Sequence, residues 1–416
     1  MSNFKRAAIA MGYRKSDTPT PALRPDLQDL YLDGIEHPIG PTIVKDAPCK
    51  KNKAFANECD LFKFPAPLIH EGDGGRYMCT WHLVATKDKS SSCINWGMYR
   101  AMILNQRTLV GPMAPLSHGA LMYFNQYEPA DEPMPFSIAI GADSLSLLAA
   151  CNPIPYGVSE MDVVGGWRGE PLEVVKCETN DLLVPASAEV VIEGIIPPKR
   201  RENEGPFAEY AGYGGGGGVP RLVYEVSCMT WRDDPILPMS NMGMPVHEAN
   251  IFTSMGYEGV IKKALRDAGI PVKAVNLVPE AASCMLVISA KITMPRVANR
   301  IMALINSMPF SSWQYKFLIC DEDVDVFNLA EVVHAWTTKC HPERGIWIEH
   351  QMSSPVCPYA ASDERRKMIA PTVMFDCTWP ADWPREHVPP KASFLQIYPK
   401  WIQEKVLNKW TEYGLK

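Results

Sequence analysis

Two glutamates lie five residues apart around a Gly-Pro turn, in the segment Glu204-Gly-Pro-Phe-Ala-Glu209. The segment follows a β-rich run and precedes five glycines at 214–218. When two carboxylates share a partly dry loop their pKa values move apart, so one holds a proton while the other stays ionised. General acid–base catalysis needs such a pair. The alternative, which this segment alone leaves open, is two solvated loop glutamates.

A second cluster begins with Asn95 and Arg100, which lie on and just after a run typical of a buried strand. Arginine keeps its charge, and its planar fork matches a carboxylate through two hydrogen bonds. His118 and Glu160 follow further along the chain. Asn, His and Glu form a mostly hard ligand set that suits Mg²⁺ or Mn²⁺, with a phosphate completing the coordination shell. Each residue also has an ordinary structural use, so spacing alone does not decide for a metal.

Other candidate motifs fail on particular positions. The acidic run that begins at Asp321 has Val326 where a calcium loop needs glycine and Val332 where it needs glutamate. His247-Glu248 has Ile251 in place of the second histidine of a zinc protease. The glycine run lacks a following Lys-Ser/Thr, so it is either a flexible loop beside a site or a direct ligand contact.

The elements that position these residues fall into two patterns. Runs rich in β-branched and aromatic residues, separated by Gly, Pro and Asp, predict a barrel-like antiparallel domain with strands at 77–86, 136–140, 189–196 and 222–229. After residue 250, strands alternate with helices, which predicts an α/β domain. Its expected helices are 259–265 and 296–307, and its expected strands are 274–278, 283–290 and 316–320.

The two ends of the chain differ from both domains. Leu27, Leu30 and Tyr31 are at helical spacing in a proline-punctuated lead-in. Seven prolines predict an irregular segment over 350–395. A helix over 399–413 carries an apolar stripe that is typical of a docking surface, formed by Trp401, Val406, Leu407 and Trp410.

Composition excludes several classes of protein. The 416 residues include 46% hydrophobic and 21% charged residues, as in ordinary globular chains. A net charge of −6 disfavours a nucleic-acid partner. The longest apolar stretch, 136–156, is interrupted by Asp143, Pro153 and Pro155, so no membrane span is expected. Twelve cysteines without a C-x-x-C pair favour a reducing cytoplasm.

The motifs taken together resemble the UbiD family of reversible (de)carboxylases, over most of the chain from about Pro41 onward. The cinnamic/ferulic acid decarboxylase branch is resembled in particular by the closing Tyr398-Pro-Lys-Trp401-x4-Val406-Leu-x2-Trp410. The remaining segments that carry the resemblance are Asn95-x4-Arg100, His118, Glu160, Glu204-Gly-Pro-Phe-Ala-Glu209-Tyr, Asp323-Val-Asp-Val-Phe and Trp336-x2-Lys339-Cys-His-Pro.

The resemblance implies an α+β fold, with a split β-barrel (flavin-reductase-like) cofactor domain and a C-terminal α/β domain. The expected division is a short N-terminal helical or irregular arm over 1–75, the barrel over 76–240, the α/β domain with its proline-rich segment over 241–395, and a docking helix over 396–416. Two departures stand out. The N-terminal segment is shorter than is usual in the family, and Pro309 stands where a lysine on the phosphate side is expected.

For function, the resemblance implies reversible non-oxidative decarboxylation of an aromatic, heteroaromatic or α,β-unsaturated acid through a covalent prenylated-FMN adduct, with a glutamate as proton donor. Arg100, Glu204 and Glu209 would be catalytic. Prenylated FMN would be held with Mn²⁺ (or Mg²⁺) and K⁺, the divalent ion by Asn95, His118 and Glu160. The expected cofactor-binding set is Thr80, Asn95, Trp96, Gly97, Met98, Arg100, Ser117, His118, Cys151, Asn152 and Glu160.

The expected partners are the carboxylic acid substrate and CO₂, a flavin prenyltransferase that supplies the cofactor, and further copies of the chain in a dimer or hexamer. Two other functions stay open. One is a non-catalytic or partner-dependent subunit of a carboxylase complex. The other is an FMN oxidoreductase, which would need no glutamate pair. Which acid is the substrate, and in which direction the reaction runs, cannot be read from the sequence.

Overall fold

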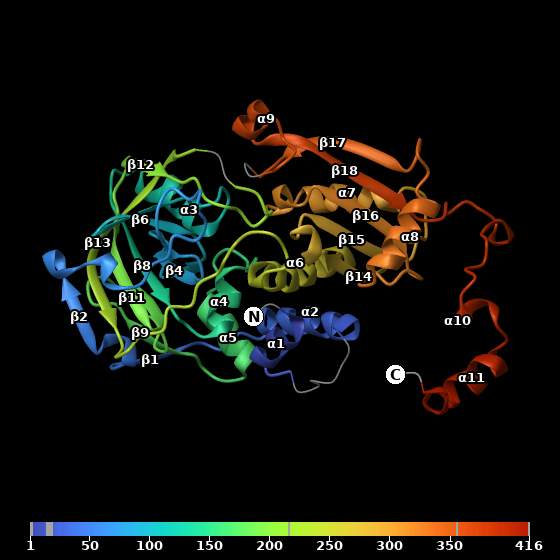
Figure 1. Ribbon diagram of the computed structural model, residues 1–416, viewed down its shortest axis with the longest axis horizontal. Helices are drawn as coiled ribbons and strands as arrows, with labels where there is room; N and C mark the ends of the chain where they lie inside the picture. Colours follow the sequence, from blue (N-terminus) through green and yellow to red (C-terminus); the bar gives the residue numbers. More distant parts are fainter. Residues whose placement is uncertain (1–2, 14–19, 215–216, 355–356, 415–416) are drawn as a thin grey trace.

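A computed structural model describes residues 3–13, 20–214, 217–354 and 357–414. Its centre is a strongly curled antiparallel sheet of ten strands in the order β3-β6-β7-β13-β11-β8-β4-β5, with β2 and β12 also paired to β13 (Figure 1). The strands are β2 Asn52–Phe55, β3 Tyr77–Cys79, β4 His82–Lys87, β5 Ile94–Gly97, β6 Ala101–Asn105, β7 Thr108–Gly111, β8 Met134–Ile140, β11 Val190–Ile196, β12 Arg201–Glu204 and β13 Val219–Trp231.

Apolar side chains fill the inside of the curled sheet, including Phe136, Ile138, Ile192 and Tyr224, all at most 1% exposed. A smaller sheet lies beside it, in the order β1-β9-β10. Short helices cover the open side of the curled sheet (Figure 1). These elements are β1 Thr42–Val44, β9 Glu173–Lys176, β10 Leu183–Pro185, α3 His118–Met122, α4 Ser144–Ala150 and α5 Glu160–Arg168.

The second domain is a five-stranded sheet in the order β14-β15-β16-β18-β17. β15, β16 and β18 run parallel, and the two edge strands run antiparallel to their neighbours. The elements are α6 Glu248–Asp267, β14 Val272–Leu277, β15 Met285–Ala290, α7 Val297–Asn306, β16 Lys316–Asp321, α8 Leu329–Lys339, β17 Ile346–Met352, α9 Ser362–Lys367 and β18 Ile369–Cys377. The curled sheet and this α/β unit confirm the predicted fold class.

Two N-terminal helices lie below α6 and beside α5 (Figure 1). They are α1 Phe4–Ala10 and α2 Thr20–Glu36. Leu27 and Tyr31 of α2 are fully buried, as their helical spacing predicted. Gln28 of α2 donates hydrogen bonds to Glu258 of α6 (2.7 Å) and to the carbonyl of Val275 (3.0 Å). The lead-in therefore joins the core and is not a free arm.

Two expectations about secondary structure are wrong. The predicted strand 77–86 is broken into β3 and β4. The segment 350–395, expected to be irregular, contains β18, which lies inside the sheet between β16 and β17. Pro371 is part of β18, opposite His350 of β17. Because proline cannot donate a hydrogen bond to a neighbouring strand, it argued against a strand at this position.

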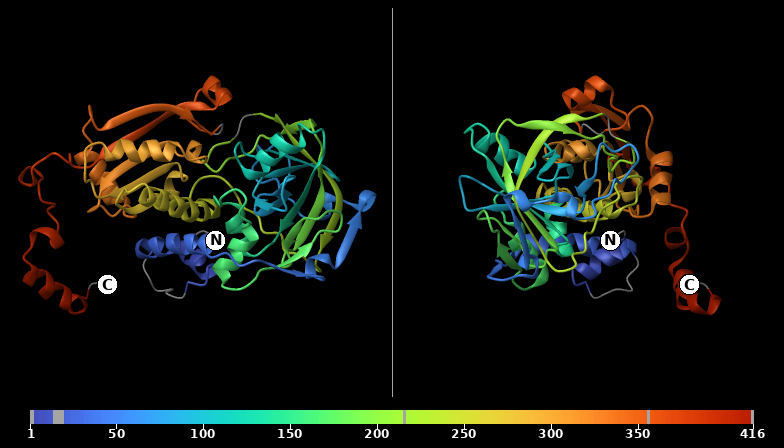
Figure 2. Two further views of the ribbon diagram at one scale, coloured as in Figure 1. Left: turned by 180° about the vertical axis from the view of Figure 1, so that it is seen from behind. Right: turned by 60° about the vertical axis from the view of Figure 1, so that its left-hand side comes forward.

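The chain ends in helices that stand away from both domains (Figures 1 and 2). They are α10 Phe394–Ile397 and α11 Lys400–Asn408, followed by a 3-10 turn, Trp410–Tyr413, so the predicted helix over 399–413 is interrupted at Lys409. None of their residues is buried, and Trp401 is 65% exposed. Among the helices of the described residues, none is both long and apolar enough to cross a membrane.

Candidate active site

A partly buried arginine joins the two glutamates of the Gly-Pro segment. Arg100 Nε donates to Glu204 Oε1 (2.8 Å), Arg100 Nη2 to Glu204 Oε2 (3.1 Å) and Arg100 Nη1 to Glu209 Oε1 (2.5 Å). The Glu204 side chain is 1% exposed and the Glu209 side chain 13%. The two glutamates are therefore not solvated loop residues but members of one ionic unit, which we call the Arg100 unit.

The two glutamates have different surroundings. Glu204 accepts a third hydrogen bond, from the hydroxyl of Tyr77 (2.7 Å), so three hydrogen-bond donors contact its side chain. Burial raises the pKa of Glu209; the charge and the hydrogen bond of Arg100 oppose this in part, and the charge of Glu204 adds to it. The raised pKa favours the protonated form of the Glu209 carboxyl group.

Arg100 keeps its charge in this environment. Burial alone would lower its pKa, but the hydrogen bonding of Arg100 to Glu204 and the charges of Glu209 and Glu204 outweigh burial and raise it. The guanidinium lies over the ring of Phe207, 4.9 Å from its centroid. The Phe207 ring in turn packs on Tyr77 at a centroid distance of 4.4 Å. The Arg100 unit is thus fixed on one side by an aromatic surface.

The turn between the glutamates depends on two glycines. Gly205 has φ +90°, a conformation that L side chains rarely adopt. A Cβ on Gly74 would lie 2.0 Å from the carbonyl oxygen of Gly205, so the neighbouring loop approaches closely only without a side chain. Gly74 N donates to the Pro206 carbonyl (2.8 Å), and Asp73 accepts from Ala208 N (3.0 Å). The loop at 73–74 therefore braces the segment that carries both glutamates.

The three predicted metal ligands also lie together. Asn95 is on β5, His118 begins α3 and Glu160 begins α5. His118 Nδ1 lies 3.0 Å from Asn95 Oδ1 and 3.9 Å from Glu160 Oε1. Burial lowers the pKa of His118, so its neutral form is favoured, and raises the pKa of Glu160 to about 8. A neutral imidazole and a buried carboxylate are suitable metal ligands.

These positions fit a divalent ion. Ligand atoms at about 2.1 Å from an octahedral ion stand roughly 3 Å from their neighbours. The 3.0 Å between His118 Nδ1 and Asn95 Oδ1 matches this spacing, and the 3.9 Å to Glu160 Oε1 is longer. Among the described residues, Glu160 has an ion-pair contact with His118, whose lowered pKa favours the neutral imidazole. A bound cation would supply the positive charge that balances the Glu160 carboxylate. No group of three His, Cys, Asp or Glu side chains with this potential occurs among the described residues, and the set depends on its asparagine.

Tyr99 connects this ligand cluster to the Arg100 unit. Its hydroxyl accepts a hydrogen bond from Gly119 N (3.1 Å) and interacts with the side chains of Ser117 and Asn95. Its carbonyl accepts from the fully buried His82 (2.8 Å). Because Arg100 is the next residue, the same backbone segment sets the positions of both clusters.

Three of the other predicted cofactor residues border the ligand cluster. Trp96 N donates to Glu160 Oε2 (2.9 Å), which orients that carboxylate. Gly97 packs against Tyr99, where a Cβ would lie 2.3 Å from the tyrosine hydroxyl. Ser117 caps α3 by accepting from Ala120 N (3.4 Å). All three therefore stabilise the backbone or the side chains next to the ligand cluster.

The remaining four are placed by other contacts. Cys151 donates to the carbonyl of Leu148, and burial raises the pKa of its thiol to about 12. Asn152 donates to the carbonyls of Leu148 (2.9 Å) and Phe252 (3.1 Å), which ties α4 to α6. Two further residues complete the set: Thr80, which accepts from Ser240 N (3.1 Å), and Met98, which packs on the core beneath α4 and α5.

Comparisons with known proteins bear on this geometry. Residues 42–245 match the family model of the 3-octaprenyl-4-hydroxybenzoate carboxy-lyase Rift-related domain (UbiD). Residues 251–377 match that of the 3-octaprenyl-4-hydroxybenzoate carboxy-lyase C-terminal domain. The chain belongs to the UbiD family. It is therefore a carboxy-lyase by family, as its motifs indicated.

Named relatives agree with this assignment. The chain is 32% identical to pyrrole-2-carboxylic acid decarboxylase of Pseudomonas aeruginosa, over 91% of this chain and 78% of that protein. It is 28% identical to ferulic acid decarboxylase 1 of Saccharomyces cerevisiae, over 90% and 76% respectively. It also resembles an evolved dimeric form of the UbiD-class enzyme HmfF from Pelotomaculum thermopropionicum in complex with prFMN (TM-score 0.77, 29% identity, 94% and 84% covered).

Several residues of this candidate site had no signal in the sequence. Tyr77, Asp73 and Tyr99 carry no motif, and Tyr77 reaches Glu204 across 127 positions of the chain. Arg221 of β13 is a further cation whose charge acts on both Glu204 and Glu209, and burial lowers its pKa. The glycine run 214–218 lies partly outside the described residues, so its contact with a ligand stays open.

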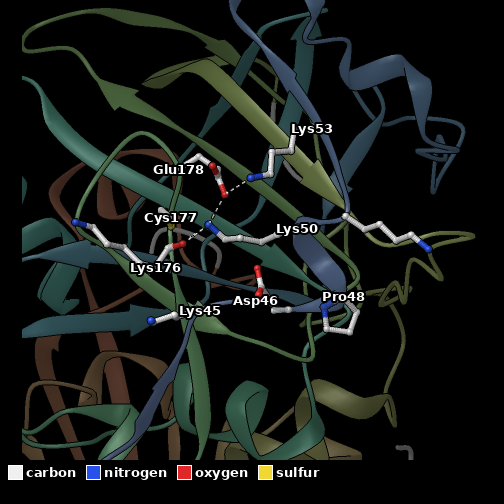
Figure 3. Close-up of a pocket in the computed structure, with 10 residues that line it drawn as sticks. Lys45, Asp46, Pro48, Lys50, Lys53, Lys176, Cys177 and Glu178 are labelled. Carbon is white, nitrogen blue, oxygen red and sulfur yellow. Dashed lines mark hydrogen bonds and ion pairs between the residues drawn. The ribbon is translucent and has the colours of Figure 1, made fainter.

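A separate pocket lies away from the UbiD site. Figure 3 shows this hollow of about 610 Å³, between β1, β2 and β9, with several lysines around it. Lys50 and Lys53 both pair with Glu178, at 2.8 and 2.9 Å. None of its lining residues belongs to the Arg100 unit or the ligand cluster. The pocket is therefore separate from the candidate active site.

Proposed function

We propose that this chain catalyses the reversible, non-oxidative decarboxylation of an aromatic, heteroaromatic or α,β-unsaturated carboxylic acid, with Glu209 as the proton donor. The observation that carries the proposal is the asymmetry of the Arg100 unit. Glu204 has three hydrogen-bond donors, whereas Glu209 has Arg100 and a raised pKa. Decarboxylation leaves a carbon that must receive a proton, and a buried, protonated carboxyl group beside that carbon can supply it.

Each residue then has a defined task. Arg100 orients the substrate carboxylate, because its charge is fixed and its guanidinium is held against Phe207. Glu204 holds Arg100 in place through two hydrogen bonds. Glu209 transfers its proton from a carboxyl oxygen to the carbon after CO₂ has left, and then regains a proton from solvent. In the carboxylation direction Glu209 removes the same proton.

The residues also support a prenylated FMN cofactor. When bound, this cofactor supplies an electrophilic centre that accepts the electron pair left by the departing CO₂. Asn95, His118 and Glu160 would hold Mn²⁺ or Mg²⁺ at its phosphate. K⁺, and supply of the cofactor by a flavin prenyltransferase, are proposed from the resemblance alone. Pro309 lies in an exposed turn after α7, so the phosphate would depend more on the metal and backbone.

The deciding experiment is co-expression of the chain with a flavin prenyltransferase. The purified protein is then studied by native mass spectrometry, absorbance and metal analysis, and is assayed for decarboxylation and H/D exchange on cinnamic, phenolic and heteroaromatic acids. Bound prenylated flavin and turnover of one class support the proposal. A correctly folded protein without flavin or metal indicates the non-catalytic subunit. Reduction by a nicotinamide donor without decarboxylation indicates an FMN oxidoreductase.

Replacing Glu204 with glutamine should shift the pH dependence of turnover. Glu209 must be protonated to donate, so kcat is highest below its raised pKa and falls as pH rises through that pKa. The charge of Glu204 raises the pKa of Glu209, so Glu204→Gln should move the falling alkaline limb to lower pH. A kcat–pH profile measures this separately from any drop in amplitude. An unshifted limb would exclude Glu209 as the titrating donor.

We also propose that the chain assembles with further copies of itself, as a dimer or a hexamer, through its C-terminal helices. The double variant Trp401→Ser, Trp410→Ser should lower the oligomer mass, because it removes two exposed aromatic side chains, 65% and 43% accessible. Light scattering after size exclusion measures the mass. Lys405→Ser on the same helix is the matched control. An unchanged mass for the double variant would refute a role for these helices.

Two further expectations stay proposals. All twelve cysteines are free thiols, which supports a reducing, cytoplasmic location. The division of the chain at residues 75, 240 and 395 is proposed as the domain organisation. Limited proteolysis followed by mass spectrometry tests it, since cleavage concentrates at exposed boundaries.

A further inference from the structure

The loop that carries Glu209 closes on itself. Glu209 N donates to the carbonyl of Tyr213 (2.9 Å), and Gly212 N donates to the carbonyl of Glu209 (2.9 Å). Ala208 and Gly214 form an isolated β-bridge at its base. A loop held by its own backbone bonds moves as a unit, so contacts made by any one side chain in it affect the position of Glu209.

One end of this loop is attached to the loop that precedes β3. Ala208 N donates to Asp73 Oδ1 (3.0 Å). The other oxygen of Asp73 accepts from His70 N (3.0 Å), and the Asp73 side chain is 2% exposed. One oxygen of the Asp73 carboxylate is therefore fixed by the backbone of its own loop, and the other oxygen fixes Ala208, the residue before Glu209.

The residue after Glu209 is attached to the other domain. The ring of Tyr210 packs on Trp313, with centroids 5.1 Å apart and planes at 41°. Its hydroxyl lies 3.3 Å from that of Tyr315, 105 positions away. Its carbonyl lies 3.4 Å from His247 Nε2, at the start of α6. Trp313 and Tyr315 directly precede β16, so three contacts join Tyr210 to the α/β domain.

The surface of the α/β domain that Tyr210 contacts is itself well packed. Tyr315 is 3% exposed, and its ring meets that of Tyr359 edge-on at 5.6 Å. The hydroxyls of Tyr210 and Tyr315 both also interact with Ser354, which is 5% exposed. A packed partner surface transmits its own position to the side chain that rests on it.

We propose that Tyr210 is a positioning residue for Glu209, and that Trp313 and Tyr315 of the α/β domain set the geometry of proton transfer through it. The inference rests on the proposed role of Glu209 as proton donor. Glu209 lies between two held residues: Ala208 is bonded to Asp73, and Tyr210 contacts Trp313 and Tyr315 of the α/β domain. The contact of Glu209 with Arg100 therefore depends on the position of the α/β domain relative to the barrel. A misplacement of about 1 Å can cost roughly a hundredfold in rate.

The test uses Trp313→Leu, which removes the stacking surface, and Tyr315→Phe, which removes only a hydroxyl. Trp336→Leu on α8 is the matched control, since Trp336 packs on Phe375 and not on the loop. For the holoenzyme, we expect kcat to fall about tenfold or more in Trp313→Leu, and less in Tyr315→Phe, with KM within about twofold. The flavin spectrum and the control variant should match wild type.

Hydrogen–deuterium exchange of the peptide over 205–214 provides a measurement that does not need activity. The amides of Glu209 and Gly212 should exchange faster in Trp313→Leu than in wild type, and unchanged exchange together with unchanged kcat overturns the inference. If wild type lacks decarboxylase activity, the proposed function fails, while faster exchange still supports the anchoring. If Trp313→Leu does not fold, Tyr315→Phe decides, and wild-type kcat and exchange in it overturn the inference.

Discussion

Replacing Glu209 with glutamine should abolish turnover while leaving the flavin bound. Glutamine has nearly the same size and its amide oxygen can still accept from Arg100 Nη1, so the Arg100 unit keeps its shape. The amide has no acidic proton to give to the carbon after CO₂ leaves. Because a positioned general acid contributes about 10²- to 10⁴-fold, we expect kcat to fall by at least about a hundredfold.

Decarboxylation rate, H/D exchange at the product carbon and the absorbance spectrum together measure this effect. Glu202→Gln is a matched control, since Glu202 is on the same strand two residues before Glu204 and its side chain is 44% exposed. The control should retain full turnover. Near-normal turnover in Glu209→Gln, with flavin bound, would remove Glu209 from the proton-transfer step.

The barrel strands could be predicted because their sequences match the physical requirement of a buried sheet. β8, β11 and β13 are rich in β-branched and aromatic residues and end at turn-forming residues. β3 and β4 were merged because no Gly or Pro separates them; the chain bends at Thr80, whose hydroxyl is bonded to Ser240 N. Such a break depends on a partner 160 positions away and leaves no local pattern.

The sequence predicts three of the five strands of the α/β domain and misses β17 and β18. In β18, Pro371 suggested irregular structure, yet its carbonyl accepts from the Tyr359 hydroxyl (2.5 Å) and its neighbours pair with β16 and β17. Ala370 and Met374 are fully buried in the same strand. Burial of these side chains outweighs the one hydrogen-bond donor that the strand lacks at Pro371.

In the candidate site, as in the fold, some residues could be predicted from the sequence and others could not. Motif resemblance identified Arg100, Glu204 and Glu209, and the structure joins all three by hydrogen bonds. It could not identify Tyr77, and it gave Tyr210 no role although Tyr210 ends the glutamate motif, because a contact with a distant carboxylate or another tyrosine has no characteristic spacing. Residues that act through a contact across the fold can be found only once the fold has brought them together.

The ligand cluster leads to the second large expected effect. His118→Ala or Asn95→Ala should lose metal and flavin together, because the proposed ion links the protein to the cofactor phosphate. Asn95 Oδ1 and His118 Nδ1 are 3.0 Å apart, so removing either leaves an incomplete shell around a buried carboxylate. Losing an outer-shell partner of a metal ligand already costs roughly 10- to 100-fold in affinity, and losing a ligand itself should cost more.

Metal content by mass spectrometry and flavin content by absorbance should therefore fall in parallel in these variants, and turnover should be lost with them. His334→Ala on the exposed side of α8 is the matched control and should retain metal, flavin and turnover. Thermal unfolding of each variant without cofactor separates loss of a ligand from loss of the fold. A folded His118→Ala protein that keeps both metal and flavin would refute the ligand role, and loss of flavin with the metal retained would show that the ion does not bridge to the phosphate.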